Sequence, residues 1–153
     1  MRVLILMLSV AGAIAVTSVL GQEQGTEKPV KLQELPPAVQ EVVKAQSKSA
    51  TVRGFSMEVK DGRTLYEIEM QAKGRTRDLT VDAQGTIVSD EQQTTLSEIP
   101  EAARTAIQKA ATGGKLTLVE KVMEGASTFY EGHIMKGGKE IEIKVDANGK
   151  PVE

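Results

Sequence analysis

Residues 61–88 read DGRTLYEIEMQAKGRTRDLTVDAQGTIV, and this stretch decides the fold. Apolar and polar side chains alternate along it, so that Tyr66 and Ile68 fall on one side of an extended chain and glutamates fall on the other. The Lys-Gly pair between the two alternating runs is a turn short enough to form a hairpin. The segment therefore predicts neighbouring antiparallel strands with one face on a core and the other in water.

The same pattern returns sixty-four residues later. Residues 32–88 align without a gap to residues 96–152, and thirteen of the fifty-seven aligned pairs are identical. Such periodicity is typical of a duplicated module. The sequence thus predicts one small module written twice. Its predicted structural anchors are Pro36, Tyr66, Val81, Asp82 and Gly85 in the first copy and Pro100, Tyr130, Val145, Asp146 and Gly149 in the second.

Each copy opens with a helix signal. Val39 and Val43 in the first copy, and Ala103 and Ile107 in the second, fall at helical spacing and form one apolar stripe. Proline suits the start of each helix, because its missing amide hydrogen costs nothing in the first turn. Strands are expected near 51–60, 64–72, 75–83 and 86–89, and again near 115–124, 127–136 and 139–147.

The predicted fold class is α+β, with two tandem copies of a helix followed by a three- to four-stranded antiparallel meander and with the helices packed on one face of the sheet. One copy alone has too little core to offset its chain entropy without a disulfide. We therefore expect the copies to pack together, through one continuous sheet or a shared apolar interface. The predicted organisation is a signal peptide at 1–21, a flexible mature N-terminus at 22–30, repeat 1 at 31–91, a linker at 92–95 and repeat 2 at 96–153.

The first twenty residues predict export. Arg2 precedes an apolar run that reaches residue 20, as in a secretory signal. A membrane span is the competing interpretation, since the run approaches the length that a bilayer requires. No cysteine follows the run, which argues against a lipoprotein anchor. We expect a periplasmic or secreted protein that contacts the membrane only through the uncleaved signal segment.

Charge and residue types exclude several classes of function. Nineteen Lys and Arg against 21 Asp and Glu leave no electrostatic footprint for nucleic acid. The chain has no cysteine, no G-x-S-x-G elbow and no phosphate-binding loop, and His133 is its only histidine. We therefore expect no catalytic, cofactor-binding or metal-ligating residues, and no enzyme.

The strands resemble those of the PepSY domain, which read like Y-E-V-E-V followed by V-D-A-x-x-G-x-V. The resemblance is carried by Tyr66, Glu67, Ile68, Glu69, Val81, Asp82, Ala83, Gly85 and Val88, and then by Tyr130, Glu131, Val145, Asp146, Ala147, Gly149 and Val152. It implies a non-enzymatic exported module, of the kind found in propeptides of thermolysin-type metallopeptidases and in envelope proteins, with a role in restraining hydrolases.

The duplicated arrangement is also similar to the beta-lactamase-inhibitor-like branch of this family. That resemblance implies two helix-plus-sheet modules that together form a concave surface. The chain departs from the inhibitor proper in having no cysteine and few aromatic residues. Because interface hot spots are rich in Trp, Tyr and Arg, the anchoring contacts of a tight inhibitor are not evident here.

Polar residues on the expected wet face are the candidate site. Carboxylates two positions apart on a strand can serve acid/base catalysis or metal binding, but alternation creates such pairs on any sheet that faces water. Likewise, the turns at Asp82 and Asp146 fit hairpin caps better than calcium loops, and Tyr66 and Tyr130 fit core anchors. The predicted partner-binding residues are Glu67, Glu69, Glu131, His133, Glu140 and Glu142.

Three functions stay open at this point. The first is an exported, non-enzymatic protein-binding module that engages an envelope or extracellular protein, such as a peptidase or beta-lactamase that it restrains. The second is a small-ligand or divalent-cation carrier in the periplasm, with a pocket between helices and sheet or with carboxylates that gather metal. The third is a structural or sensory element of an envelope assembly.

Overall fold

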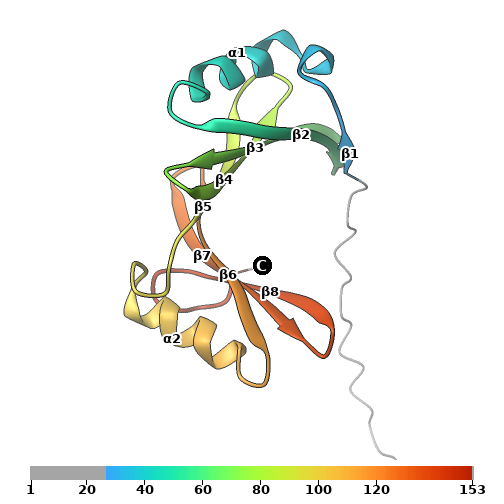
Figure 1. Ribbon diagram of the computed structural model, residues 1–153. Helices are drawn as coiled ribbons and strands as arrows, with labels where there is room; N and C mark the ends of the chain where they lie inside the picture. Colours follow the sequence, from blue (N-terminus) through green and yellow to red (C-terminus); the bar gives the residue numbers. More distant parts are fainter. Residues whose placement is uncertain (1–26, 153) are drawn as a thin grey trace, which may run out of the picture.

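The computed structural model describes residues 27–152, and a single antiparallel sheet dominates them (Figure 1). The predicted signal peptide and most of the predicted flexible segment lie outside these residues. The strands follow one another in sequential order across the sheet, and two α-helices lie on its outer side. The strands are β1 (Lys28–Pro29), β2 (Thr51–Lys60), β3 (Arg63–Ala72), β4 (Arg75–Asp82), β5 (Ile87–Gln93), β6 (Lys115–Glu124), β7 (Ser127–Lys136) and β8 (Lys139–Val145). The helices are α1 (Pro37–Gln46) and α2 (Glu101–Ala110), and a 3-10 turn (Leu32–Glu34) precedes α1.

The predicted fold class is wrong in how it divides the sheet. It assigns each half its own helix and three- to four-stranded meander, whereas the structure has one eight-stranded meander. The difference lies in β5, which runs on to Gln93 and pairs with β6 from Asp90 opposite Met123 to Gln93 opposite Glu120. Backbone pairing needs no apolar side chains, so the polar residues 90–93 extend the strand without showing apolar alternation.

The N-terminal edge also differs from the expectation. Lys28 and Pro29, in the segment predicted to be flexible, pair with Met57 and Ser56 of β2. The backbone N–H of Val30 then donates to the carbonyl oxygen of Phe55 at 3.0 Å. Proline has no N–H to donate, which suits a strand at the edge of a sheet.

Each helix covers its own apolar cluster on the outer side of the sheet. In α1 the predicted stripe of Val39 and Val43 is buried, and in α2 that of Ala103 and Ile107. Gly132 of β7 lets α2 approach closely, because a Cβ there would lie 2.6 Å from Ile107 Cγ2. The first cluster comprises Leu35, Val39, Val43, Ile68, Met70, Leu79 and Val81, and the second Ile99, Ala103, Ile107, Val119 and Val145.

Some predicted core residues are less enclosed than the alternation indicates. Tyr66 and Tyr130 are only partly buried at the margins of the two clusters. Ile141, which alternation also assigns to the core, is 47% exposed. It lies near the tip of the β7–β8 hairpin, whereas α2 covers the other end of β8 at Val145.

The turn after β8 shows why aspartate and glycine recur there. The carboxylate Oδ1 of Asp146 accepts hydrogen bonds from the backbone N–H groups of Asn148 at 2.8 Å and Lys150 at 2.9 Å. Asp82 makes the equivalent pair of bonds in the turn after β4. Gly149 has a φ of +75°, a conformation that glycine adopts without strain. The carboxylates of these turns therefore cap the backbone.

Candidate functional site: an acidic concave face

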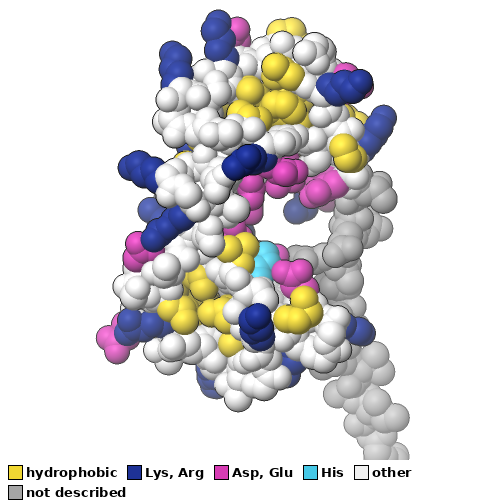
Figure 2. Space-filling model, viewed as in Figure 1, with side chains coloured by type: hydrophobic (Ala, Val, Ile, Leu, Met, Phe, Trp, Pro, Cys, Tyr) yellow, Lys and Arg dark blue, Asp and Glu magenta, His cyan; other side chains and the backbone are white. Residues whose placement is uncertain are grey.

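The inner side of the sheet is concave and acidic. The sheet curls so that α1 and α2 lie outside it (Figure 1), and the space-filling view shows a hollow between the two helix-bearing ends (Figure 2). Acidic side chains and the histidine gather around this hollow (Figure 2). The acidic face is defined here as eight of the carboxylates that the strand pairing places on this side, namely Glu67, Glu69, Asp78, Glu91, Glu120, Glu131, Glu140 and Glu142.

Strand register sets like charges directly opposite one another on this face. Glu69 of β3 pairs with Asp78 of β4, which in turn pairs with Glu91 of β5. On the other half of the sheet, Glu120 of β6 pairs with Glu131 of β7. Directly opposed like charges destabilise antiparallel strand pairs. A departure from this local rule is typical of a functional surface.

Two of these carboxylates are buried. Glu120 retains 4% of its accessible surface and Glu131 retains 5%. Simple alternation places Glu131 on a face open to water, but Glu120 of β6 and Lys144 of β8 flank it in the sheet, and Lys144 contacts its carboxylate. A carboxylate removed from water stays charged only when cations or hydrogen-bond donors surround it.

Burial and neighbouring charge raise the pKa of several carboxyls. Loss of water, followed by repulsion from Glu131, raises the pKa of Glu91 to about 7. Loss of water, followed by repulsion from Glu27, raises the pKa of Glu67 to about 7. The pKa values of Asp78 and Glu131 are also raised, with loss of water again the main cause. Glu67 and Glu91 therefore change between the protonated and the charged form near neutral pH.

His133 lies between two carboxylates. Its Nε2 is 3.0 Å from Glu120 Oε2, and its Nδ1 is 3.1 Å from Glu140 Oε1. The hydrogen bond to Glu120 is the main reason why the pKa of His133 is raised to about 9, and burial opposes it. The ring is therefore a cation at neutral pH. The sequence shows His133 only as a single histidine on a strand face open to water, and it does not reveal that Glu120 and Glu140 lie beside the ring.

Lys144 of β8 is a further cation on the concave side, beside Glu131. Its Nζ lies 3.1 Å from Glu131 Oε1 and 2.5 Å from Glu124 Oε1. It also lies 5.1 Å from the centroid of the Phe129 ring, within range of a cation–π interaction. Burial lowers the pKa of Lys144, but the bonds to the two glutamates outweigh it and the pKa is raised. The carboxylates of the acidic face still outnumber these two cations.

The structure places all six predicted partner-binding residues on the concave side, although it separates them into two groups. Glu67 and Glu69 lie on β3, whereas Glu131, His133, Glu140 and Glu142 lie across the hollow on β7 and β8. The members that sequence reasoning does not nominate are Asp78, Glu91 and Glu120. Only the register between strands could have identified them, because register places Asp78 opposite Glu69 and Glu120 opposite Glu131. Glu91 follows in the same row, opposite Asp78.

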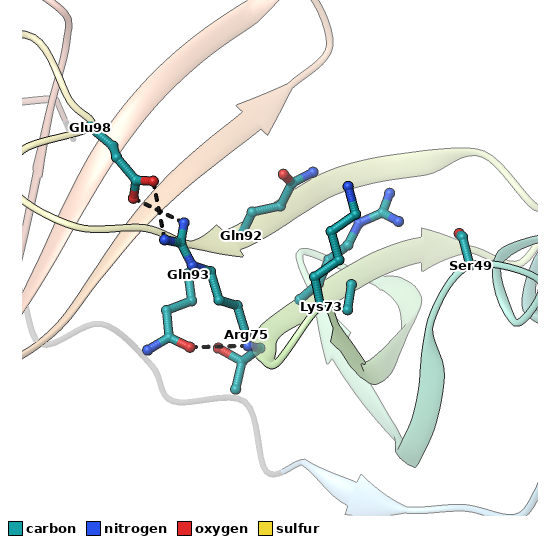
Figure 3. A pocket seen from close by; sticks show the side chains of 9 residues that line it. Ser49, Lys73, Arg75, Gln92, Gln93 and Glu98 are labelled. Carbon is teal, nitrogen blue, oxygen red and sulfur yellow. Dashed lines mark hydrogen bonds and ion pairs between the residues drawn. The ribbon is translucent and has the colours of Figure 1, made fainter.

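A second, polar hollow lies where the β3–β4 hairpin meets the end of β5 (Figure 3). Its arginines are engaged within the protein. Arg75 donates two hydrogen bonds to Glu98, at 2.9 and 3.1 Å, and Arg77 donates two to Asp90, at 2.9 and 2.7 Å. These bonds fasten β4 to β5 and to the segment before α2. The arginines of this hollow therefore stabilise the connection between the two halves of the sheet.

A shallow apolar groove runs between α1 and β2, lined in part by Leu32, Val43 and Phe55. It corresponds to the pocket between helix and sheet that a small-ligand carrier would need.

Three side chains of the concave side come together as metal ligands do. One ligand atom from each of Glu120, Glu131 and His133 lies within 4.8 Å of the others. Carboxylate oxygen and imidazole nitrogen are the donors with which proteins bind zinc and similar ions.

The second half of the chain matches a known family. Residues 100–149 match the family model described as Peptidase propeptide and YPEB domain, PepSY. A comparison with curated protein sequences finds no match. Within residues 27–152, no helix has the length and apolar character needed to cross a membrane.

Several solved structures share the fold. A candidate periplasmic protein from Bacteroides eggerthii is 18% identical with a TM-score of 0.62, over 78% of this chain and 86% of its own. A BLIP-like protein from Bacteroides fragilis is 20% identical with a TM-score of 0.56, over 78% and 84%. A DUF2874 family protein from Bacteroides uniformis is 19% identical with a TM-score of 0.60, over 77% and 86%. At these identities the likeness shows the fold alone.

The family match lies on the half of the chain whose strands carry Tyr130, Glu131, Val145, Asp146 and Gly149, the residues on which the sequence resemblance depends. The resemblance to the PepSY domain is confirmed by this match, which covers residues 100–149 of the chain.

Proposed function

We propose that this protein is an exported, non-enzymatic PepSY-like module that binds another envelope protein through its acidic face. The partner presents Lys and Arg side chains on a convex surface that enters the hollow. The partner class that we propose is a hydrolase, of the peptidase or beta-lactamase type, whose activity the module restrains.

The observation that carries this proposal is the direct opposition of carboxylates across the sheet. Glu69, Asp78 and Glu91 stand side by side on three neighbouring strands, and none of them takes part in an ion pair within residues 27–152. Cations supplied by a partner would remove this repulsion. Complementary charge would also speed association and discriminate against partners that are acidic.

The comparisons support the location and the kind of partner. The predicted signal segment and the similar fold of the candidate periplasmic protein from Bacteroides eggerthii favour export. The family description refers to peptidase propeptides, and one similar structure is BLIP-like, which favours a hydrolase as the partner.

The geometry on the concave side favours binding over catalysis. His133, the only histidine in the sequence, is held as a cation between Glu120 and Glu140. A protonated imidazole with both nitrogens engaged is a poor general base. The charged His133 ring can take part in a binding surface in the position that it already occupies, beside Glu120 and Glu140.

The first test compares two double variants in affinity capture from an envelope extract. Glu69→Gln with Glu142→Gln removes two exposed charges from the acidic face, and Glu41→Gln with Glu101→Gln removes two exposed charges from the helices. We expect the face variant to lose the captured partner and the helix variant to keep it. Capture of the same partner in equal amount by both variants would refute the acidic face as the binding surface.

The second test addresses restraint. The captured partner is purified, and its hydrolase activity is titrated with the unmodified protein and with the same two double variants. We expect inhibition by the unmodified protein and by the helix variant, at a concentration that rises with salt because screening weakens the charge attraction. If the partner binds through the acidic face but keeps its full hydrolase activity, the protein is a binding module and the proposed inhibitory role is wrong.

A further inference from the structure

We infer that Glu120, Glu131 and His133 form a binding site for a divalent transition-metal ion of the zinc class on the concave side of the β6–β7 pair. The sequence alone predicts no metal ligands, because the spacing of these residues along the chain shows no metal-binding motif. Pairing of β6 with β7 creates the arrangement. The site does not depend on any protein partner, so it stands or falls separately from the proposed function.

The backbone fixes the three ligands. Glu120 and Glu131 are directly opposed on neighbouring strands, and His133 follows Glu131 by two residues on the same face. One donor atom from each lies within 4.8 Å of the others, and His133 Nε2 is 3.0 Å from Glu120 Oε2. Two ligand atoms about 2.1 Å from a tetrahedral ion are about 3.4 Å apart, so small side-chain rotations would admit an ion. The ion would replace the proton that His133 Nε2 shares with Glu120, and that proton would leave to solvent.

The two nitrogens of His133 already have different partners. Nε2 lies 3.0 Å from Glu120 Oε2, while Nδ1 lies 3.1 Å from Glu140 Oε1 on β8. A histidine that binds a metal nearly always gives its other ring N–H to a carboxylate, a backbone carbonyl or a water, which holds the ring in place. Glu140 is in position for that role. This partner is independent of the Glu120–Glu131 pair and distinguishes the site from a simple acidic cluster.

Burial gives the two carboxylates a reason to take a cation. Glu120 and Glu131 are 4% and 5% exposed and lie directly opposite each other on neighbouring strands, an arrangement that an intervening cation would stabilise. Lys144 reaches Glu131 but shares its ammonium group with Glu124. A divalent ion between the carboxylates would neutralise both at once.

The donor set selects among metals. Two carboxylates and one imidazole suit zinc, which accepts nitrogen and oxygen ligands in four-coordinate sites and can complete its shell with water. Calcium prefers six to eight oxygen ligands and has no use for the imidazole. We therefore expect zinc to bind and calcium and magnesium to compete weakly.

The first experiment titrates the purified protein with zinc chloride by calorimetry and repeats the titration in excess calcium or magnesium. We expect one zinc ion per chain, little changed by the competing ions. His133→Gln removes a ligand and should weaken binding at least roughly a hundredfold, and Glu140→Gln, which loosens the ring, roughly tenfold. Glu101→Gln is the matched control, because this exposed glutamate lies on α2 on the other side of the sheet, and it should change affinity less than threefold.

A second experiment avoids any variant that fails to fold. Because His133 is the only histidine, nitrogen NMR of the unmodified protein resolves its two ring nitrogens without ambiguity. Zinc should shift the Nε2 resonance strongly and leave Nδ1 protonated. The absence of saturable zinc binding, an unshifted imidazole in the zinc-bound protein, or equal binding by His133→Gln would each overturn the inference.

Discussion

Replacing Glu91 by glutamine should stabilise this protein at about pH 8 and leave its stability almost unchanged at about pH 4.5. In the folded protein Glu91 faces Asp78 on one side and Val122 on the other, and it is repelled by Glu131 and Glu120. Glutamine keeps the shape of the side chain and an oxygen that can accept the hydrogen bond from Ser89. The substitution therefore removes charge and little else.

The magnitude follows from the pKa of Glu91, which rises from 4.5 to about 7 on folding. Between these values the folded protein holds a proton that the unfolded chain has released, so stability falls as the pH rises through this window. The full difference corresponds to roughly 3 kcal/mol above both pKa values. Because solvent near the carboxyl reduces the effect, we expect a gain of about 1 to 3 kcal/mol from Glu91→Gln above the window.

Urea unfolding followed by circular dichroism at the two pH values is the assay. Glu41→Gln is the matched control, because Glu41 is exposed on α1 and forms an ion pair with the exposed Lys44, at 3.5 Å. Such a surface pair contributes less than about 1 kcal/mol, so the control should change little at either pH. A Glu91→Gln protein that is equally stable or less stable than the unmodified protein at the higher pH would refute the electrostatic reasoning.

Two further substitutions, measured by the same urea unfolding, test how the fold is held together. Gly149→Ala should lower the free energy of unfolding by about 2 kcal/mol or more, since φ is positive and a Cβ would lie 2.5 Å from the carbonyl oxygen of Ala102. Gly62→Ala also has a positive φ but no atom near its Cβ, so it should cost about 1 kcal/mol. Equal costs would show that the turn at Gly149 does not pack on α2. Arg77→Gln should cost about 3 kcal/mol because it leaves the carboxylate of Asp90, only 13% exposed, without its partner, and adding Asp90→Asn should recover part of the loss. No recovery in the double variant would contradict the ion-pair explanation.

Local signals were sufficient to locate most elements of the fold. The apolar stripe of α2 and the alternation of β7 depend on residues only a few positions apart, so the sequence predicts both with nearly the observed bounds. The division of the sheet depends instead on residues 90–93, which are polar and pair through the backbone alone. No side-chain pattern reports such pairing, and the predicted fold class was wrong for this reason.

The candidate site is predictable in composition and not in geometry. Alternation places Glu67, Glu69 and Glu131 on the same face as His133, and the structure agrees. Which carboxylates meet is decided by register between strands distant in the chain. That register opposes Glu120 to Glu131, and the curl of the sheet buries both.

The two ligands that we propose for the acidic face, a basic protein surface and a metal ion, need not compete. The row from Glu69 to Glu91 lies on β3, β4 and β5, while the candidate metal ligands lie on β6 and β7. A basic partner surface can therefore meet the first group while a metal ion occupies the second. Loss of partner binding in a variant of β3 should leave zinc binding intact.

The carboxyl pKa values of Glu67 and Glu91, followed by carbon NMR across the acidic and neutral range, test most directly whether the concave face holds charge that the fold does not compensate. The account predicts midpoints of about 7 for both, while Glu98, which accepts two hydrogen bonds from Arg75, should titrate at about 2 in the same experiment. Midpoints near 4.5 for both Glu67 and Glu91 would show an ordinary solvated surface and contradict it.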